Sequence, residues 1–316
     1  MSFFRIIFII LLVFSLLSSE ITPADGKTLE KALWVWNTSE ILDSSSEMEE
    51  FLSFLSNEEF TCIFLQIPGD FDIKADKIRL LISDLSSINI KVYALDGSKD
   101  YVLPEHHASV LETVDEIILY NEQSESCEKF YGIQYDIEPY LLPEFKTEKQ
   151  GWILENYIEL LKKISDKTCK KGLLFSAAIP FWFDSPDQYT KQIRTVTLDG
   201  LTKPLLEEII DLTDNVALMD YRTVAGGNNG IIALAQNELS YASLKNKEVF
   251  IGLETKPLSD NNLTFASMGL TELKSVMEEA KKKLIEYNSF SGFAIHEYRS
   301  YRKLVNKENI NGNKYQ

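Results

Sequence analysis

The sequence predicts a single (β/α)8 barrel, on three observations. Eight short apolar runs recur along the 316 residues, and they start about 30 to 43 residues apart, a spacing typical of β-α units rather than of hairpins. The segments between them carry helical periodicity. No Pro-, Gly- or Ser-rich linker and no charge block divides the chain. A doubly wound open sheet is the alternative, but no G-x-G-x-x-G follows the first run.

The apolar runs are the expected strands, in chain order: 32–36, 61–67, 91–95, 132–137, 172–179, 216–219, 249–253 and 292–295. The clearest helices are expected at 151–168 and 269–288, because apolar residues recur there every three or four positions with Lys and Glu between them. Eight such β-α units in about 300 residues match the size of a TIM barrel.

The first 19 residues are expected to be a signal peptide, which leaves 20–316 as the barrel domain. They contain one positive charge, Arg5, an apolar run over 6–17, and then Ser18 and Ser19. That run of about 12 residues is shorter than the ~20 needed to span a bilayer. An uncleaved signal anchor is the alternative. Both interpretations send the chain into the secretory pathway, so we expect a secreted protein.

The composition limits the classes of partner. Apolar residues make up 45% and charged residues 25% of the chain, which is ordinary for a globular protein. The 32 Lys and Arg against 48 Asp and Glu give a formal net charge of −16. Such a charge repels nucleic acid and anionic lipid and favours a neutral or cationic ligand, such as a sugar or an amine. We expect a monomer with no integral membrane domain.

Cysteine and histidine usage predicts a disulfide but neither a metal nor a cofactor. Cys62 lies inside an apolar run and is expected to be a buried thiol. Cys127 and Cys169 each precede an expected strand, so a disulfide between them is expected if those strands are neighbours and parallel. His106 and His107 lack the spacing of metal ligands, and His296 alone does not form a zinc site.

The carboxyl ends of the expected strands carry many acidic and aromatic residues. Chemistry in TIM barrels takes place at these ends. The residues found there are Trp36, Gln66, Asp96, Asp136, Glu138, Phe181, Trp182, Asp220, Tyr221, Arg222, Glu254, His296 and Tyr298.

The fourth strand provides the most informative stretch, FYGIQYDIEPY. Because side chains alternate along a strand, Gln134, Asp136 and Glu138 are expected to share the face toward the barrel interior. Two carboxylates about 7 Å apart separate their pKa values, so one can donate a proton while the other stays ionised. Cleavage of a glycosidic bond needs this division of roles. The alternative is a pair of solvated carboxylates that end a strand.

This stretch resembles the strand-four signature of glycoside hydrolase family 18, the chitinase-like barrels, which reads D-G-x-D-x-D-x-E. Aligned over 131–138, the glycine and the final D-x-E match, whereas Tyr131 and Gln134 replace the first two aspartates. The resemblance implies that Glu138 is the general acid and that Asp136 orients the acetamido group of the substrate.

A second short motif also resembles this family, which has Met-x-Tyr at the end of strand six. The chain has Met219 and Tyr221 there, so the resemblance implies that Tyr221 supports the reaction centre by hydrogen bonding. Arg222 follows where the family usually has Asp. His296 and Tyr298 lie where the family usually has Trp. These three, with Gln134, are expected to bind the substrate.

Glu254 is a further candidate catalytic residue, because many retaining glycosidases place a nucleophilic Glu after strand seven. It would lie across the barrel mouth from Glu138. Ile137 counts against this version, since those enzymes usually have Asn before the strand-four Glu. The alternative is a structural ion pair between Glu254 and Lys256.

Aromatic residues at the strand ends favour a carbohydrate ligand. The apolar faces of sugar rings stack on aromatic side chains. Trp36 and Trp182 are expected to bind the substrate, whereas Trp34 is expected in the core. The sequence therefore predicts a secreted glycoside hydrolase with Glu138 as proton donor. The alternative is a non-catalytic chitinase-like lectin.

Overall fold

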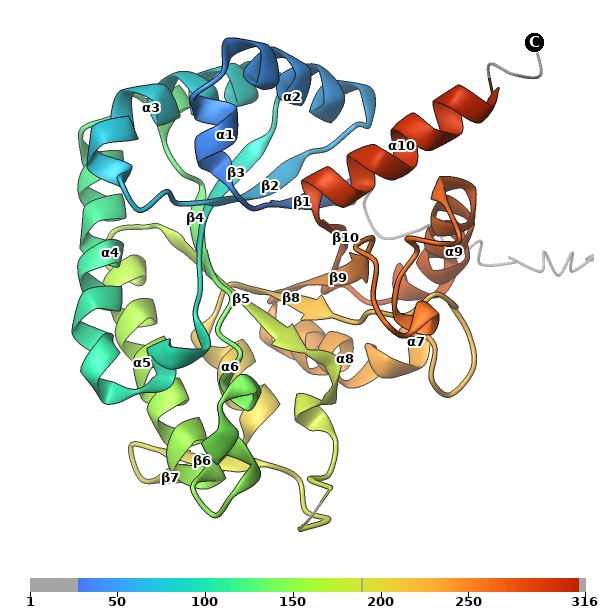
Figure 1. The fold of residues 1–316 in the computed structure, drawn as a ribbon. Helices are drawn as coiled ribbons and strands as arrows, with labels where there is room; N and C mark the ends of the chain where they lie inside the picture. Colours follow the sequence, from blue (N-terminus) through green and yellow to red (C-terminus); the bar gives the residue numbers. More distant parts are fainter. Residues whose placement is uncertain (1–27, 189, 313–316) are drawn as a thin grey trace, which may run out of the picture.

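Eight parallel strands close into a barrel in the computed structural model, which describes residues 28–188 and 190–312 (Figure 1). Around the barrel the order is β1-β10-β9-β8-β5-β4-β3-β2. The predicted (β/α)8 fold is confirmed, because each expected apolar run forms one of these strands. Their bounds are β1 Glu30–Val35, β2 Cys62–Gln66, β3 Lys91–Asp96, β4 Gly132–Tyr135, β5 Leu174–Pro180, β8 Asn215–Met219, β9 Glu248–Glu254 and β10 Phe290–His296.

Helices surround the strands as an outer layer (Figure 1). They are amphipathic; in α5, for example, Ile153, Tyr157 and Leu160 are buried against the sheet side, as their spacing predicts. Their bounds are α1 Thr38–Leu42, α2 Ser45–Asn57, α3 Phe71–Ser87, α4 Pro104–Glu122, α5 Gln150–Cys169, α6 Leu205–Leu212, α7 Ile231–Leu234, α8 Gln236–Lys245, α9 Leu270–Leu284 and α10 Tyr298–Gly312.

Large aromatic side chains fill the interior of the barrel. The ring of Phe64 lies at centroid distances of 5.2 Å from Trp34, 5.6 Å from Tyr93 and 5.9 Å from Phe250. All four side chains are buried, which confirms the expected core position of Trp34. Because these rings pack the barrel, a ligand has access only to its ends, and the fold places chemistry at the carboxyl ends of the strands.

A short antiparallel hairpin, β6 Thr195–Leu198 and β7 Leu201–Pro204, interrupts the barrel pattern between β5 and α6. It projects beyond α5 and α6 in Figure 1. The hairpin is not among the expected elements, although Asp199-Gly200 between two short alternating runs is a recognisable turn signal. Both turn residues have positive φ, 51° and 80°, as a type I′ turn requires.

The expected disulfide is wrong for this structure, which contains Cys127 and Cys169 as separate free thiols. Strands β4 and β5 are indeed parallel neighbours, but the 3-10 turn η2 (Ser126–Glu128) packs on α3. The Sγ of Cys127 accordingly lies 3.9 Å from the Ser83 hydroxyl on α3, and Cys169 ends α5. Cys62 is a buried free thiol, as expected.

The expected signal peptide at 1–19 lies outside the described residues. Within 28–188 and 190–312, no helix is both long enough and apolar enough to cross a membrane.

Candidate active site

A pocket of about 740 Å³ opens at the carboxyl ends of the strands. Its wall combines residues that follow five different strands with residues of α10. The lining residues are Trp36, Asn37, Gly97, Ser98, Lys99, Asp136, Glu138, Thr255, Lys256, Pro257, Ala266, His296, Glu297, Arg299, Ser300, Lys303, Leu304 and Lys307. Four of the residues expected at the site, namely Trp36, Asp136, Glu138 and His296, thus meet in one cavity.

Asp136 lies immediately after β4, where its backbone is held against β3. Its N–H donates to the Asp96 carbonyl over 2.9 Å. Gly97 packs so closely that a Cβ there would lie 2.1 Å from the Asp136 carbonyl oxygen, so only glycine fits this position. Burial and the nearby Glu138 raise the pKa of Asp136 to about 7. Its Oδ1 has no hydrogen-bond partner among the described residues.

Glu138 is held by the side chain of Tyr140, whose hydroxyl donates a hydrogen bond to Oε1. Pro139 and Tyr140 begin a 3-10 turn, η3 (Pro139–Leu141), that carries the chain back over the strand end. Burial and the adjacent Glu138 raise the pKa of Tyr140, so this hydroxyl keeps its proton. Sequence reasoning did not include Tyr140, although it lies two residues after Glu138 in the same motif.

A chain of hydrogen bonds connects Trp36, His296 and Glu254. The indole N–H of Trp36 donates to Nε2 of His296 over 3.2 Å. Nε2 is therefore the acceptor, which leaves the ring proton on Nδ1 for donation to Glu254 Oε2 over 2.9 Å. The other oxygen of Glu254 accepts the backbone N–H of Lys256 over 2.6 Å.

Glu254 is therefore enclosed, with only 4% of its surface exposed. Its contacts match neither of the two roles expected for Glu254, which are a nucleophile and an ion-pair partner of Lys256. Both carboxylate oxygens are already bonded, and the contact with Lys256 is made by the backbone rather than by the ammonium group. Glu254 orients His296 and does not line the pocket.

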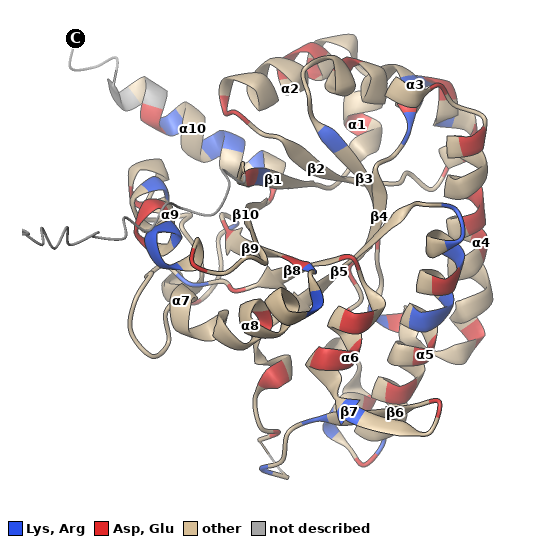
Figure 2. Ribbon diagram, turned by 180° about the vertical axis from the view of Figure 1, so that it is seen from behind, with Lys and Arg blue, Asp and Glu red and all other residues tan. Residues whose placement is uncertain are grey.

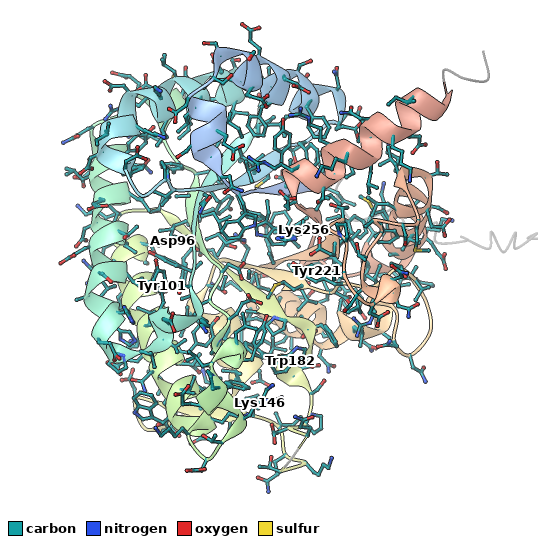
Figure 3. The ribbon with its side chains drawn as sticks, viewed as in Figure 1. Asp96, Tyr101, Lys146, Trp182, Tyr221 and Lys256 are labelled. Carbon is teal, nitrogen blue, oxygen red and sulfur yellow. The ribbon has the colours of Figure 1, made fainter. Side chains whose placement is uncertain are left out.

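Tyr221 follows β8 and lies beside the same group. Its ring centroid is 6.0 Å from that of His296. Burial, with the charges of Glu254, Asp136 and Glu138, raises the pKa of its hydroxyl. Tyr221 is thus a neutral hydrogen-bonding group near Asp136 and Glu138. Figure 3 shows Tyr221 and Lys256 close to the ring of strands, with Trp182 and Lys146 farther out.

The expectation that Gln134 and Tyr298 bind the substrate is wrong. Gln134 lies on the barrel interior one layer below Asp136, has no exposed surface, and bonds Trp34 and Ser176. Tyr298 is 3% exposed, because as the first residue of α10 it turns onto α2, where its ring lies 4.9 Å from that of Phe51. Both are structural residues that no ligand in the pocket can reach.

Trp182 and Arg222 lie beside the pocket rather than in it. Trp182 lines a separate cavity of about 480 Å³, and its ring is 5.1 Å from that of Tyr140. Because Tyr140 also bonds Glu138, the second cavity begins one side chain away from the carboxylates. Arg222 lies over the ring of Phe181 at 4.5 Å and bonds the Tyr221 carbonyl.

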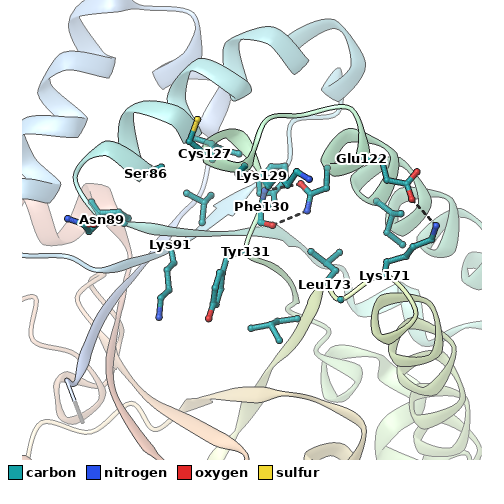
Figure 4. A pocket seen from close by; sticks show the side chains of 18 residues that line it. Ser86, Asn89, Lys91, Glu122, Cys127, Lys129, Phe130, Tyr131, Lys171 and Leu173 are labelled. Carbon is teal, nitrogen blue, oxygen red and sulfur yellow. Dashed lines mark hydrogen bonds and ion pairs between the residues drawn. The ribbon is translucent and has the colours of Figure 1, made fainter. Parts of the chain in front are cut away.

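Another hollow, of about 770 Å³, lies at the opposite end of the barrel, at the amino ends of β3, β4 and β5 (Figure 4). Lys91 there pairs with Glu30 over 2.5 Å, and Lys171 pairs with Glu122 over 2.8 Å. Tyr131, which replaces the first aspartate of the family signature, stacks under Lys91 at 5.0 Å. None of the expected catalytic residues reaches this end.

Over the part of the chain that the structure describes, no group of three or more His, Cys, Asp and Glu side chains could hold a metal ion.

Comparisons with known proteins agree with this architecture. No protein-family model matches the sequence, and no curated protein matches it either. A chitinase from Chromobacterium violaceum is similar in structure, with a TM-score of 0.50 and 12% identity over 88% of this chain and 98% of that one. A glycoside hydrolase family 18 N-acetylglucosaminidase from Paenibacillus barengoltzii gives a TM-score of 0.54 and 12% identity over 87% and 97%. At such identities the similarity establishes the fold alone: the protein has the barrel fold of these two structures.

Proposed function

We propose that the protein is a glycoside hydrolase in which Glu138 donates a proton to the glycosidic oxygen. The observation that supports this most directly is the placement of Asp136 and Glu138 together in a 740 Å³ pocket at the carboxyl end of the barrel. Trp36 gives the same pocket an aromatic wall suited to a sugar ring. The fold shared with chitinase-type enzymes agrees with this substrate class.

Asp136 fits the role of a ligand-orienting residue. Its buried Oδ1 has no partner among the described residues, and an unpaired buried oxygen is costly unless a ligand or water satisfies it. An N–H group on the bound sugar, such as that of an acetamido substituent, would supply this hydrogen bond. With a pKa of about 7, Asp136 can also hold or release a proton near neutral pH.

The bond would then break in one proton-coupled step. Glu138 transfers its proton to the leaving oxygen as the C–O bond at the anomeric carbon breaks, and becomes a carboxylate that Tyr140 stabilises by its hydrogen bond. Glu254 is enclosed, so the group that attacks the anomeric carbon is a water molecule or the acetamido oxygen of the sugar itself.

A non-catalytic lectin is the second candidate. Two observations favour it: Gln134 and Tyr131 replace two family aspartates, and Tyr140 already engages Glu138. In this version the pocket binds a glycan through the same aromatic and polar groups, and no bond breaks.

A screen of the purified chain without residues 1–19 separates these functions. Oligosaccharides and aryl glycosides would be tested for both binding and product formation. Products that depend on Glu138 support the hydrolase, whereas binding without products supports the lectin. The absence of both would contradict both. We also propose secretion, which follows from residues 1–19, and its test is recovery of the processed chain from the culture medium.

A further inference from the structure

One wall of the active-site pocket is rich in positive charge. Lys99 follows β3, Lys256 follows β9, and Arg299, Lys303 and Lys307 come from α10. Sequence reasoning did not single out any of the five as a ligand-binding residue. These five cations come from three separate segments and meet at one pocket. The carboxylate motif alone does not explain this concentration of positive charge.

The three residues on α10 form a stripe along one helix face. Arg299, Lys303 and Lys307 are spaced four residues apart, so their side chains lie one above the other. Eight residues of helix cover about 12 Å. The stripe therefore begins at the pocket and continues over a length that suits several repeating units of an extended ligand.

Four of the five cations at this wall are available for a ligand. Arg299 pairs with Glu40. In contrast, Lys99, Lys256, Lys303 and Lys307 form no ion pair with any residue in the described ranges 28–188 and 190–312, and all four are exposed. On the neighbouring face of α10, Arg302 pairs with Glu47 and Glu50 on α2. On α10, Lys303 and Lys307 are thus the pocket cations without an ion-pair partner in these ranges, whereas Arg299 and Arg302 are paired.

The carboxylates that line the pocket, Asp136, Glu138 and Glu297, form no ion pair with these four lysines. Glu297 accepts the backbone N–H groups of Arg299 and Ser300 over 3.2 and 3.1 Å, so it caps the start of α10. Glu138 is bonded by Tyr140. Asp136 has a raised pKa and is partly protonated near neutral pH.

The local charge opposes that of the whole chain. The net charge is −16, and acidic residues are frequent on the outer helices, whereas α10 carries several Lys and Arg (Figure 2). A cluster of one sign at the mouth of a cleft concentrates ligands of the other sign. The expectation of a neutral or cationic ligand, which used the net charge alone, did not consider this distribution.

We propose that the glycan bound in this pocket is anionic, with carboxylate or sulfate groups that contact Lys303 and Lys307 on α10 and Lys99 and Lys256 at the mouth. This inference rests on the proposed function in one respect, which is that the ligand is a carbohydrate. It adds the chemical class of that carbohydrate.

The test measures the binding of four hexasaccharides to the chain without residues 1–19 by isothermal titration calorimetry. They are a neutral chitin oligosaccharide, its cationic de-N-acetylated form, an unsulfated chondroitin oligosaccharide with carboxylates, and its sulfated form. We expect an anionic probe to bind at least about tenfold more tightly than the neutral one at 20 mM salt, and to lose most of this advantage at 500 mM. The two anionic probes distinguish carboxylate from sulfate recognition.

Charge-reversal variants identify the binding surface. The double variant Lys303→Glu/Lys307→Glu should weaken the anionic probe by about tenfold or more and leave the neutral probe within about twofold. The matched control is Lys170→Glu/Lys282→Glu, which reverses two exposed lysines that lie outside the pocket lining. Circular dichroism would verify that both variants fold.

Each outcome is decisive. Tightest binding of a neutral or cationic probe, or equal losses in the two double variants, would overturn the inference and leave the proposed hydrolase intact. Failure of all four probes to bind would contradict a glycan ligand of this class and the proposed function with it.

Discussion

Nδ1 of His296 lies 2.9 Å from Oε2 of Glu254, so a carboxylate on β9 fixes the orientation of an imidazole on β10. The opposite ring nitrogen accepts the indole N–H of Trp36 on the next segment of the barrel. The buried acid thereby controls, through one histidine, the position of an aromatic wall of the pocket. Its effect on a ligand is indirect.

Glu254→Gln tests whether Glu254 acts as a nucleophile or a positioning residue. Glutamine cannot accept both hydrogen bonds that the carboxylate accepts, so Trp36 should be less well held. We expect KM to rise several-fold, consistent with loss of one hydrogen bond of about 1 kcal/mol, while kcat stays within about threefold. Steady-state kinetics on a confirmed substrate provides both values.

His296→Ala is the companion variant. It breaks the same series of hydrogen bonds at the residue that contacts Trp36 directly. It should raise KM in the same direction and increase quenching of Trp36 fluorescence by acrylamide. A fall in kcat of about 10³-fold in Glu254→Gln with unchanged KM would instead identify Glu254 as a nucleophile.

Stability should decrease as the pH rises from 5 to 8, because of buried acids that include Asp220 and Glu238 beside Asp136. Asp220 and Glu238 have no exposed surface, and their carboxyl oxygens have no hydrogen-bond partner among the described residues. Burial raises the pKa of Asp220 to about 7 and also raises that of Glu238. The folded chain keeps these protons in a range where the unfolded chain has lost them, so the free energy of unfolding falls as the pH rises.

Urea denaturation at pH 5 and pH 8 measures this effect. Asp220→Asn should reduce the pH dependence and raise the free energy of unfolding at pH 8 by roughly 1–3 kcal/mol. Glu279→Gln, at an exposed position on α9, is the control and should leave the pH dependence unchanged. A wild-type chain that becomes more stable between pH 5 and 8 would contradict the assignment.

The cysteines should react as three free thiols with different accessibility. Cys127 and Cys169 are exposed, whereas Cys62 is buried, and burial raises the pKa of its thiol. Iodoacetamide should therefore label two cysteines in the native chain and the third only after denaturation. Mass mapping under non-reducing conditions checks this; a peptide that links Cys127 to Cys169 would contradict it.

Tyr140→Phe tests the contact that sequence reasoning missed. The variant keeps the ring and its packing on Trp182 but removes the hydroxyl that donates to Glu138. We expect kcat to fall about tenfold with little change in KM, because the carboxylate formed after proton transfer loses a hydrogen bond. Tyr287→Phe serves as the control, because Tyr287 follows α9 and lies far from Tyr140 in the sequence. An unchanged kcat would remove Tyr140 from the reaction.

The strands could be predicted because each is a short apolar run bounded by polar residues, and the barrel order then places their carboxyl ends together. Asp136 and Glu138 were found in this way, since they follow directly on the end of β4. Gln134 shares that alternation, but it is enclosed in the barrel interior, where it accepts the indole N–H of the buried Trp34.

Residues outside the strands were harder to predict. Tyr298 follows β10 in the sequence, but the start of α10 at that residue turns its ring onto α2. The same helix supplies Lys303 and Lys307 to the pocket, and their four-residue spacing is visible in the sequence. Which face of α10 meets the pocket depends on long-range packing, and a single sequence does not reveal this.

The most direct test of the central claim is the turnover of Glu138→Gln on a glycan that the wild-type chain both binds and cleaves. Glutamine keeps the shape of the side chain and removes the acidic proton, so turnover should fall by roughly 10²-fold or more while binding persists. Glu144→Gln, at an exposed position six residues on, should retain wild-type rates. Full activity of Glu138→Gln, measured by mass spectrometry of the products, would contradict the assignment of Glu138 as the proton donor.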